Sequence, residues 1–207
     1  MTAMPDPSAT TSLILASASR SRAELLRGAG LDFDVEPARL DEDELKAAMR
    51  ANGAGASDVA EALAKAKACR TARARPGALV IGADQMLDCA GIWFDKPADL
   101  VEAAAHLRRL RDHTHELVTS VCIVQDDRPL WHHTARARLT MRPFSDDFIT
   151  SYLDRVGPRA CDSVGAYQLE GLGAQLFSRI EGDYFTILGL PLLPLLAFLR
   201  EHGVVAA

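Results

Sequence analysis

Hydroxyl and guanidinium side chains are clustered in Ser17-Ala18-Ser19-Arg20-Ser21-Arg22, between a short apolar run and a helical pattern. Hydroxyls, backbone N–H groups at a helix start and arginine side chains are groups that bind phosphate oxygens. Ser17, Ser19, Ser21 and Arg22 are therefore candidate phosphate ligands. An ordinary helix N-cap with solvated arginines is the alternative. The patterns G-x-x-x-x-G-K-[ST] and G-x-G-x-x-G do not occur in the chain, so the usual P-loop and Rossmann sites are not expected.

Asp84 and Gln85 come just past the end of the apolar run 78–82, which predicts a buried strand. In open α/β sheets, ligands bind at the carboxyl ends of strands, so a side chain at this position can face a cleft. A carboxylate there can take a proton from water or hold a metal ion. The alternative is an aspartate that only caps the turn.

Two lysines and one glycine-rich segment are further candidates. Lys65 lies in the segment 64–67, and Lys96 precedes a proline, which favours an extended conformation for the lysine. Surface charge is the alternative for both. The segment 165–174 has several glycines around one carboxylate, Glu170. That composition is typical of a loop that approaches a ligand closely, or of a simple turn cluster.

Histidines and cysteines give a weaker pattern. His113-x-His115 and the pair His132-His133 suggest zinc, but no third ligand follows at a suitable spacing, so a zinc site is not expected. The chain has 4 cysteines and no C-x-x-C pair. Isolated cysteines of this kind are typical of small buried residues in a reducing cytoplasm.

The elements that must position these residues alternate between strands and helices, which predicts the α/β class. Period-two alternation indicates a half-buried strand over 134–142, and a capping box at Asp99 and Glu102 opens one helix. Ser57-Asp58 and Ser145 are expected to cap two others. The predicted strands are 13–16, 78–82, 117–124 and 134–142, and the predicted helices are 23–29, 57–74, 99–111, 145–156 and 193–202.

Composition limits the class of partner. Hydrophobic residues make up 48% of the 207 residues and charged residues 25%, which is ordinary globular usage. The formal net charge of -5 argues against a protein that coats nucleic acid. The apolar stretch 187–199 contains two prolines and is too short to cross a bilayer. Residues 1–11 lack the pattern of a signal peptide. We expect a cytoplasmic protein that binds neither nucleic acid nor membrane.

Taken in order, these motifs resemble the Maf family of nucleotide pyrophosphatases. The resemblance covers residues 13–203, nearly the whole chain. The matching motifs are Ser-Ala-Ser-x-x-Arg-x-x-Leu-Leu, Ala-Lys-Ala, Gly-Ala-Asp, Lys-Pro, Thr-His-x-Leu-Val-Thr, Gly-Ala-Tyr-x-x-x-Gly-x-Gly and Gly-Leu-Pro-Leu.

The resemblance implies an α/β fold like that of Maf and inosine triphosphatase proteins. Such a fold is an elongated mixed β-sheet flanked by helices, with two lobes and a deep cleft. A disordered tail over residues 1–11 and a single domain over residues 12–205 are expected. The implied activity is hydrolysis of a nucleoside triphosphate between its α and β phosphates, with Mg²⁺ or Mn²⁺ as the divalent metal cation. The implied assembly is a homodimer.

The resemblance also implies roles for individual residues. Asp84 matches the catalytic aspartate, the general base on the attacking water. Arg22 matches the arginine of the phosphate loop, and Lys65 and Lys96 match two cleft lysines that steady phosphate charge. Glu42 matches an acidic residue near the metal, so the metal ligands would be Glu42 and Asp84.

Gln85 and Glu170 match the branch of the family that acts on 7-methyl-GTP rather than on dTTP and UTP. The chemistry agrees, because guanine presents two N–H donors that one carboxylate can accept together. Methylation at N7 makes the base cationic and adds attraction to Glu170. The chain departs from the family at Ser21, where an aromatic or arginine is usual, and at Asp95, which replaces a glycine.

Two alternatives remain. The first is a broad-specificity nucleoside triphosphate pyrophosphatase that acts on many canonical or damaged nucleotides. The second is a nucleotide-binding regulator of cell division without turnover. The intact set of Arg22, Lys65, Asp84 and Lys96 argues against the regulator, because a protein that only binds has no need of the aspartate.

Overall fold

The computed structural model describes residues 12–206, so the tail expected over residues 1–11 lies outside the described part of the chain. A seven-stranded mixed sheet forms its centre, in the order β2-β1-β3-β5-β6-β7, with β4 paired to β3. The strands are β1 (Leu13–Leu15), β2 (Asp34–Val35), β3 (Leu79–Cys89), β4 (Ile92–Phe94), β5 (Thr114–Gln125), β6 (Arg128–Met141) and β7 (Phe177–Glu181). β1 is parallel to β2 and β3, whereas the other pairs are antiparallel.

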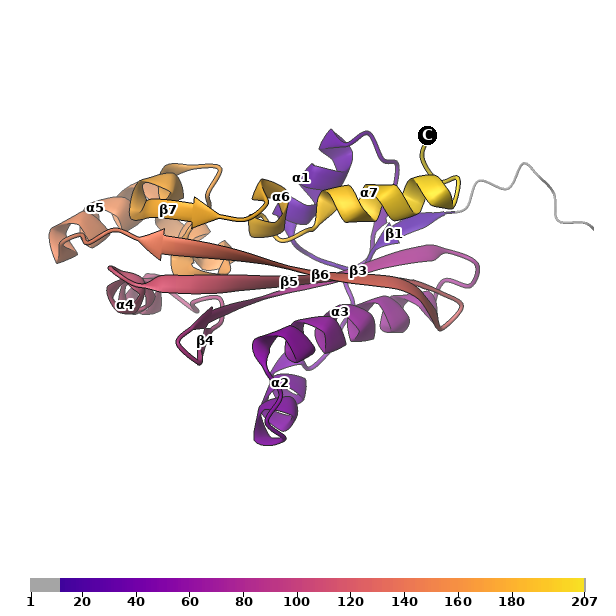
Figure 1. Cartoon of the computed structure of the whole chain (residues 1–207), viewed down its shortest axis with the longest axis horizontal. Coiled ribbons are helices and arrows are strands. Elements are labelled where there is room, and N and C mark those ends of the chain that lie inside the picture. The colour runs from indigo at the N-terminus through magenta and orange to yellow at the C-terminus, as the bar shows by residue number, and fades with distance from the viewer. Residues whose placement is uncertain (1–11, 207) are drawn as a thin grey trace, which may run out of the picture.

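Helices cover both faces of this elongated sheet. The α-helices are α1 (Arg20–Gly28), α2 (Glu42–Ala51), α3 (Ala56–Ala72), α4 (Leu100–Leu110), α5 (Asp146–Val156), α6 (Tyr184–Ile187) and α7 (Leu192–Glu201). Figure 1 shows α3 below the sheet, α1, α6 and α7 above it, and α4 and α5 towards one end. The predicted mixed α/β architecture is therefore confirmed.

Alternation along β3 assigns successive side chains to opposite faces. Leu79, Ile81 and Ala83 belong to the apolar cluster under α7, whereas Val80 packs with the alanines of α3. The same period places Gly82 and Asp84 on the α3 face and Gln85 on the opposite face. The side chains of Asp84 and Gln85 therefore lie on opposite faces of the sheet.

Gly82 allows α3 to lie unusually close to β3. A Cβ atom on Gly82 would be 2.1 Å from the carbonyl oxygen of Ala64 and 2.8 Å from Cβ of Ala68. Only glycine leaves room for this approach. Because Lys67 lies between these two alanines, the close approach brings its side chain to the neighbouring residue on the same face, Asp84.

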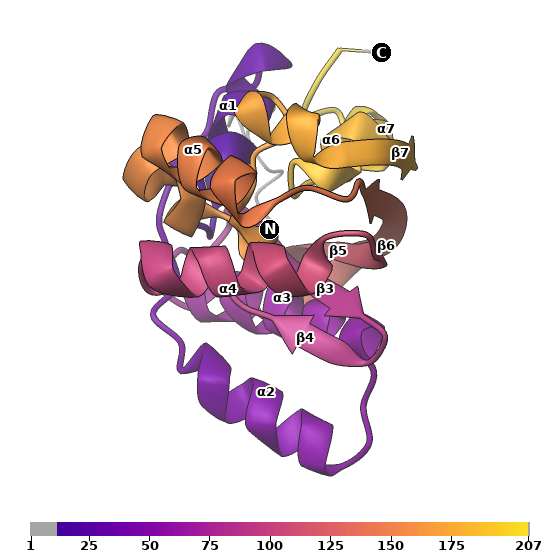
Figure 2. The same cartoon turned by 90° about the vertical axis from the view of Figure 1, so that its left-hand side faces the viewer.

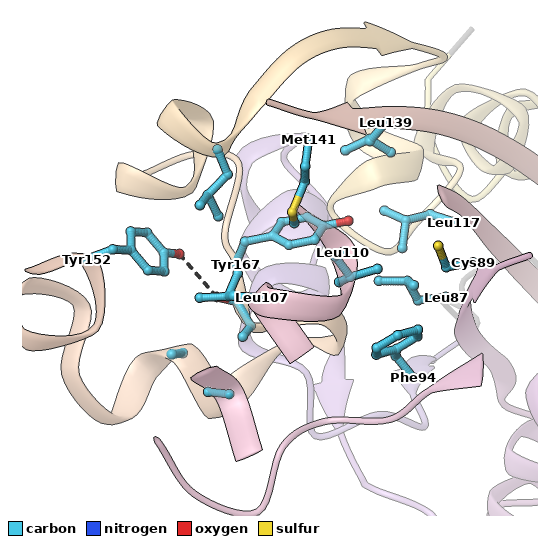
Figure 3. Close-up of a cluster of buried hydrophobic side chains, with 14 of the residues drawn as sticks. Leu87, Cys89, Phe94, Leu107, Leu110, Leu117, Leu139, Met141, Tyr152 and Tyr167 are labelled. Carbon is cyan, nitrogen blue, oxygen red and sulfur yellow. Dashed lines mark hydrogen bonds between the residues drawn. The ribbon is translucent and has the colours of Figure 1, made fainter. Parts of the chain in front are cut away.

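A second apolar cluster fills the end of the sheet near α4 and α5, where Leu87, Leu107, Leu139 and Met141 are buried (Figure 3). Two tyrosines belong to it. The hydroxyl of Tyr152 donates to the carbonyl of Ala166, at 3.1 Å. The irregular segment 157–176 packs on this cluster. It contains the 3₁₀ turns Gly157–Asp162, Val164–Ala166 and Leu172–Leu176.

The strands and helices predicted from the sequence are all present, with two corrections. β3 extends to Cys89, so Asp84 lies within the strand rather than just past its end. The N-cap of α3 is Gly55, and the predicted cap residue Asp58 instead accepts a hydrogen bond from the N–H of Gly55 at 3.0 Å. Asp99 and Ser145 do cap α4 and α5. Within residues 12–206, no helix is long and apolar enough to span a membrane.

Candidate active site

A large cavity opens at a gap along one edge of β3. On this edge, β1 pairs with residues 79–81 and β4 pairs with residues 87–89. Between them, residues 82–86 have no strand partner on this edge within the described chain, whereas β5 pairs continuously along the other edge. The segments that follow β1 and β4 both lead away from this gap, and each contributes residues to the wall of a cavity of about 1110 Å³.

Most of the residues proposed from the sequence line this one cavity. They come from separate segments of the chain, which the fold brings together. The predicted residues that line it are Ser17, Ser19, Ser21, Arg22, Glu42, Asp84, Gln85, Lys96 and Glu170.

The turn between β1 and α1 presents groups that can bind an anion. The hydroxyl of Ser17 accepts from the backbone N–H of Ser19, and the hydroxyl of Ser19 caps the helix by accepting from the N–H of Arg22 at 3.4 Å. The start of α1 therefore faces the cavity with N–H groups and hydroxyls, which favour an anion.

Arg22 is buried and supports this loop from below. Its guanidinium donates to the hydroxyl of Ser17 at 3.0 Å, to the carbonyl of Ala83 at 2.9 Å and to the carbonyl of Gly189 at 2.7 Å. The bond to Ala83 fills part of the unpaired edge of β3. Burial lowers the pKa of Arg22, and Asp84 and Glu42 counteract that effect. Arg22 thus joins the loop, the strand gap and the segment before α7, and it adds positive charge under the cavity.

Three charged side chains meet on the α3 face of the gap. The ammonium group of Lys67 is 2.7 Å from Oδ1 of Asp84 and 3.0 Å from Oε2 of Glu42. Asp84 is only 6% exposed. Burial raises the pKa of Asp84 above its usual range, although Lys67 and Arg22 favour the charged form. A carboxyl group with a raised pKa accepts a proton more readily, which suits a general base.

One predicted site residue, Lys65, lies outside the cavity. Lys65 is exposed on the outer side of α3 and does not line the cavity, whereas Lys67 does. Helical spacing would have favoured Lys67 over Lys65. Lys67 lies three residues after Ala64 and four before Thr71, and both of these are buried on the side of α3 that faces the sheet. Lys65 instead lies four residues from the exposed Glu61.

The segment after β4 adds further charge to the wall. Lys96 lines the cavity. Its pKa is lowered mainly by burial and, to a smaller extent, by repulsion from Arg22. Asp95 accepts a hydrogen bond from Lys46 of α2, with 2.5 Å between Nζ and Oδ1. Lys46 and Asp95 also line the cavity, and Lys46 was not among the residues predicted from the sequence.

On the other face of β3, the amide of Gln85 is held in one orientation. Its nitrogen donates to the hydroxyl of Thr119 at 2.8 Å and to the carbonyls of Thr186 and Ile187 at 3.0 and 3.2 Å. Those two carbonyls can only accept, so the amide oxygen must point away from them. Gln85 therefore contributes a hydrogen-bond acceptor to the cavity, as does the exposed carboxylate of Glu170.

The segment that carries Glu170 is anchored at several points. The hydroxyl of Ser163 donates to the carbonyl of Tyr167, and the ring of His115 shares a 2.8 Å hydrogen bond with the Tyr167 hydroxyl. A Cβ atom on Gly173 would lie 2.4 Å from the carbonyl oxygen of Gln168, so this chain crossing requires glycine. The anchored backbone gives Glu170 a defined position despite its exposure.

The histidines and cysteines take other positions. His115 is buried against Tyr167, His113 bonds to the carbonyl of Arg111, and His132 faces Glu61 at 3.7 Å. No group of three or more histidine, cysteine, aspartate or glutamate side chains that could hold a metal ion occurs within residues 12–206. The cysteines are free thiols, of which Cys89 and Cys122 are buried.

Comparison with known proteins matches nearly the whole chain. A family model described as "Maf-like protein" matches residues 12–202. A nucleoside triphosphate pyrophosphatase of Paramagnetospirillum magneticum is 56% identical over 190 residues, which cover 92% of this chain and 98% of the relative. A 7-methyl-GTP pyrophosphatase of Rhizobium meliloti is 52% identical over 195 residues, which cover 94% and 98%. A solved HAM1 protein of Coxiella burnetii is 16% identical, with a TM-score of 0.40, and covers 63% of this chain and 73% of its own.

Proposed function

The chain belongs to the Maf family, and we propose that its cavity hydrolyses a nucleoside triphosphate to a nucleoside monophosphate and pyrophosphate. One observation carries this assignment to the cavity. The buried carboxylate of Asp84 lies beside Lys67 and opens into the same space as the phosphate-binding loop of Ser17 and Ser19. A base, a cation and an anion-binding loop are the groups that hydrolysis of a phosphoric anhydride requires.

Each group has a distinct task in this reaction. The N–H groups and hydroxyls at the start of α1 hold phosphate oxygens and orient the α-phosphorus towards Asp84. Asp84 accepts the proton of the attacking water. Lys67 and Lys96 stabilise the negative charge that spreads over the phosphate oxygens as the anhydride bond breaks.

Glu42 and Asp84 are the residues that would hold a divalent cation. Both carboxylates line the cavity and face the same ammonium group of Lys67, which is 3.0 Å from Oε2 of Glu42 and 2.7 Å from Oδ1 of Asp84. Carboxylate oxygens suit Mg²⁺, which commonly takes one or two carboxylates together with substrate phosphates and water. Such a cation would supply neutralising charge to the triphosphate.

We further propose that 7-methylguanine and guanine are the preferred bases. Gln85 presents its amide oxygen and Glu170 its carboxylate, so both side chains offer acceptors. Guanine has adjacent N1–H and N2–H donors on its Watson–Crick edge, whereas uracil has one N–H between two carbonyls that acceptors repel. The positive charge of a 7-methylated base adds attraction to Glu170.

The products of the reaction test the assignment. Purified protein with Mg²⁺ or Mn²⁺ and a triphosphate panel should release monophosphate and pyrophosphate in equal amounts. Diphosphate and orthophosphate as main products would show attack at the γ-phosphorus and contradict the proposal. Binding of nucleotide without turnover would favour the regulator, and similar kcat/KM values for all bases would favour the broad-specificity enzyme.

A further inference from the structure

The helix α2 contributes two charges to the cavity and little to the core. Glu42 and Lys46 are one turn apart, so they lie on one face of the helix, and both line the cavity. No residue of α2 is fully buried. Figure 2 shows α2 below α3, at the margin of the molecule. Its cavity-facing charges therefore require an explanation other than packing.

We propose that Lys46 is a further phosphate-binding residue, which holds the β- and γ-phosphates that leave as pyrophosphate. The inference rests on the proposed function, because it assumes that the triphosphate is cleaved beside Asp84. It assigns to α2 a subsite for the leaving group, distinct from the loop of Ser17 and Ser19.

The two faces of β3 give the direction of the substrate. Gln85 and its partner α6 lie on one face, and Asp84, Lys67 and α2 lie on the other. If the base is bound by Gln85, the triphosphate must pass the strand gap to reach Asp84. The phosphates beyond the α-phosphorus then continue on the face where α2 lies, towards Lys46.

The ion pair with Asp95 is the arrangement expected for a Lys46 side chain that exchanges this carboxylate for a phosphate anion. The side chain of Lys46 is 19% exposed, whereas that of Asp95 is 62% exposed. A pair with so exposed a partner adds little to stability. Burial opposes the charge on Lys46, but the hydrogen bond to Asp95 and the negative charges of Asp95, Asp84 and Glu42 together outweigh burial and raise the pKa of the lysine. Asp95 thus keeps the ammonium charged and oriented until a pyrophosphate group, with its greater charge, replaces the carboxylate.

The simplest alternative is that the Lys46–Asp95 pair only fastens α2 to the segment after β4. The two interpretations predict different results for the two partners. If the pair is a fastener, loss of either side chain should have the same effect. If Lys46 binds pyrophosphate, loss of Lys46 should weaken binding, and loss of the competing charge of Asp95 should strengthen it.

Direct titration of inorganic pyrophosphate into the full-length protein with Mg²⁺ tests the inference without requiring turnover. Lys46→Met should raise the Kd for pyrophosphate roughly tenfold, as for the loss of a charge-assisted hydrogen bond, and Lys46→Arg should retain most of the affinity. Asp95→Asn should lower this Kd. The Kd for GMP should stay within about twofold in all three variants. Lys65→Met, which removes an exposed lysine outside the cavity, is the matched control and should change neither Kd.

Equal weakening of pyrophosphate binding by Lys46→Met and Asp95→Asn would overturn the inference in favour of the fastener. Unchanged pyrophosphate affinity in Lys46→Met, or an equal loss for GMP, would also overturn it. The products of the wild-type enzyme are measured in parallel. If they are orthophosphate and diphosphate, the proposed function fails whatever the titrations show. If they include pyrophosphate and Lys46→Met binds it normally, only the leaving-group subsite fails.

Discussion

The ammonium group of Lys67 lies 2.7 Å from Oδ1 of Asp84, inside a cavity wall where both side chains are buried. The same ammonium group is 3.0 Å from Glu42, so one lysine faces two carboxylates. The two carboxylates place negative charge beside the expected position of a polyanionic substrate. A divalent cation at Glu42 and Asp84 would remove that repulsion and would free Lys67 to face the phosphates.

Lys67→Met should therefore lower kcat/KM for the best triphosphate by about 10²-fold, in the range found when one charge-stabilising group is lost from an active site. The steady-state rates of the variant and wild type give the measurement. Lys65→Met should stay within about twofold of wild type, because Lys65 lies on the exposed side of the same helix. Equal losses in the two variants would show that charge on α3, rather than contact in the cavity, is responsible.

Asp84→Asn should retain the fold and bind nucleotide while kcat falls by about 10²-fold or more, because asparagine cannot accept the proton of water. The melting temperature and nucleotide Kd, measured beside kcat, separate loss of chemistry from loss of structure. A variant that keeps half of the wild-type kcat would remove Asp84 from the proton-transfer step.

Much of the fold was predictable where local signals and tertiary packing agree. Asp99 and Ser145 begin helices because their side chains accept from backbone N–H groups three residues later. The length of β3 was not predictable, because Asp84 and Gln85 have the polarity of residues that end a strand. They remain in the strand because β5 pairs with β3 continuously through this segment, with Asp84 opposite Ser120 and Gln85 opposite Thr119.

The segments missed by the sequence analysis are mostly short or only partly buried. α2 begins in the acidic run 41–44, and its short apolar stripe, which includes Leu45 and Met49, is only partly buried against the core. β2 has two exposed residues, and four of the five residues of β7 are exposed. For the same reason Lys46 was missed. Its position depends on where α2 is placed in space, and that placement is not encoded by local pattern.

Glu170→Gln tests the proposed preference for guanine. The variant keeps one acceptor but places an amide N–H against a base N–H, so kcat/KM for GTP should fall roughly 10- to 150-fold, as for loss of a hydrogen bond to a charged group. The fall should be larger for 7-methyl-GTP, because the cationic base also loses a charge attraction. UTP should be used better than by wild type, because glutamine can both donate and accept. An equal fall for all three substrates would place Glu170 in loop structure instead of base recognition.

Gly82→Ala should destabilise the protein, because the new methyl group meets the backbone of α3 at Ala64. The helix must move to relieve the overlap, at a cost of about 1–3 kcal/mol or more in the free energy of unfolding, measured with urea. The movement should also lower kcat, since it displaces Lys67 from Asp84. Gly28→Ala is the control, because a Cβ atom at Gly28 has nothing within 4 Å. Equal stability of the two variants would show that α3 can shift freely.

His115 should make the folded protein sensitive to acid. Burial lowers its pKa from 6.5 to about 4, so the folded state resists a proton that the unfolded chain accepts. The contribution of His115 to stability is fully present above the pKa that this histidine has in the unfolded chain. It is lost as the pH falls from that value towards about 4. When the pH falls from 7 to 5, this one residue should lower the free energy of unfolding by about 2 kcal/mol.

The variant His115→Gln isolates this effect, because glutamine does not titrate and can still bond to the hydroxyl of Tyr167. Urea unfolding at pH 7 and pH 5 should show a smaller acid-induced loss in the variant than in the wild type, by about 2 kcal/mol. His113→Gln, at an exposed position two residues away, should keep the wild-type pH dependence. If His115→Gln loses as much stability between the two pH values as the wild type, His115 takes up a proton within the fold, and its bond to Tyr167 does not require the neutral ring.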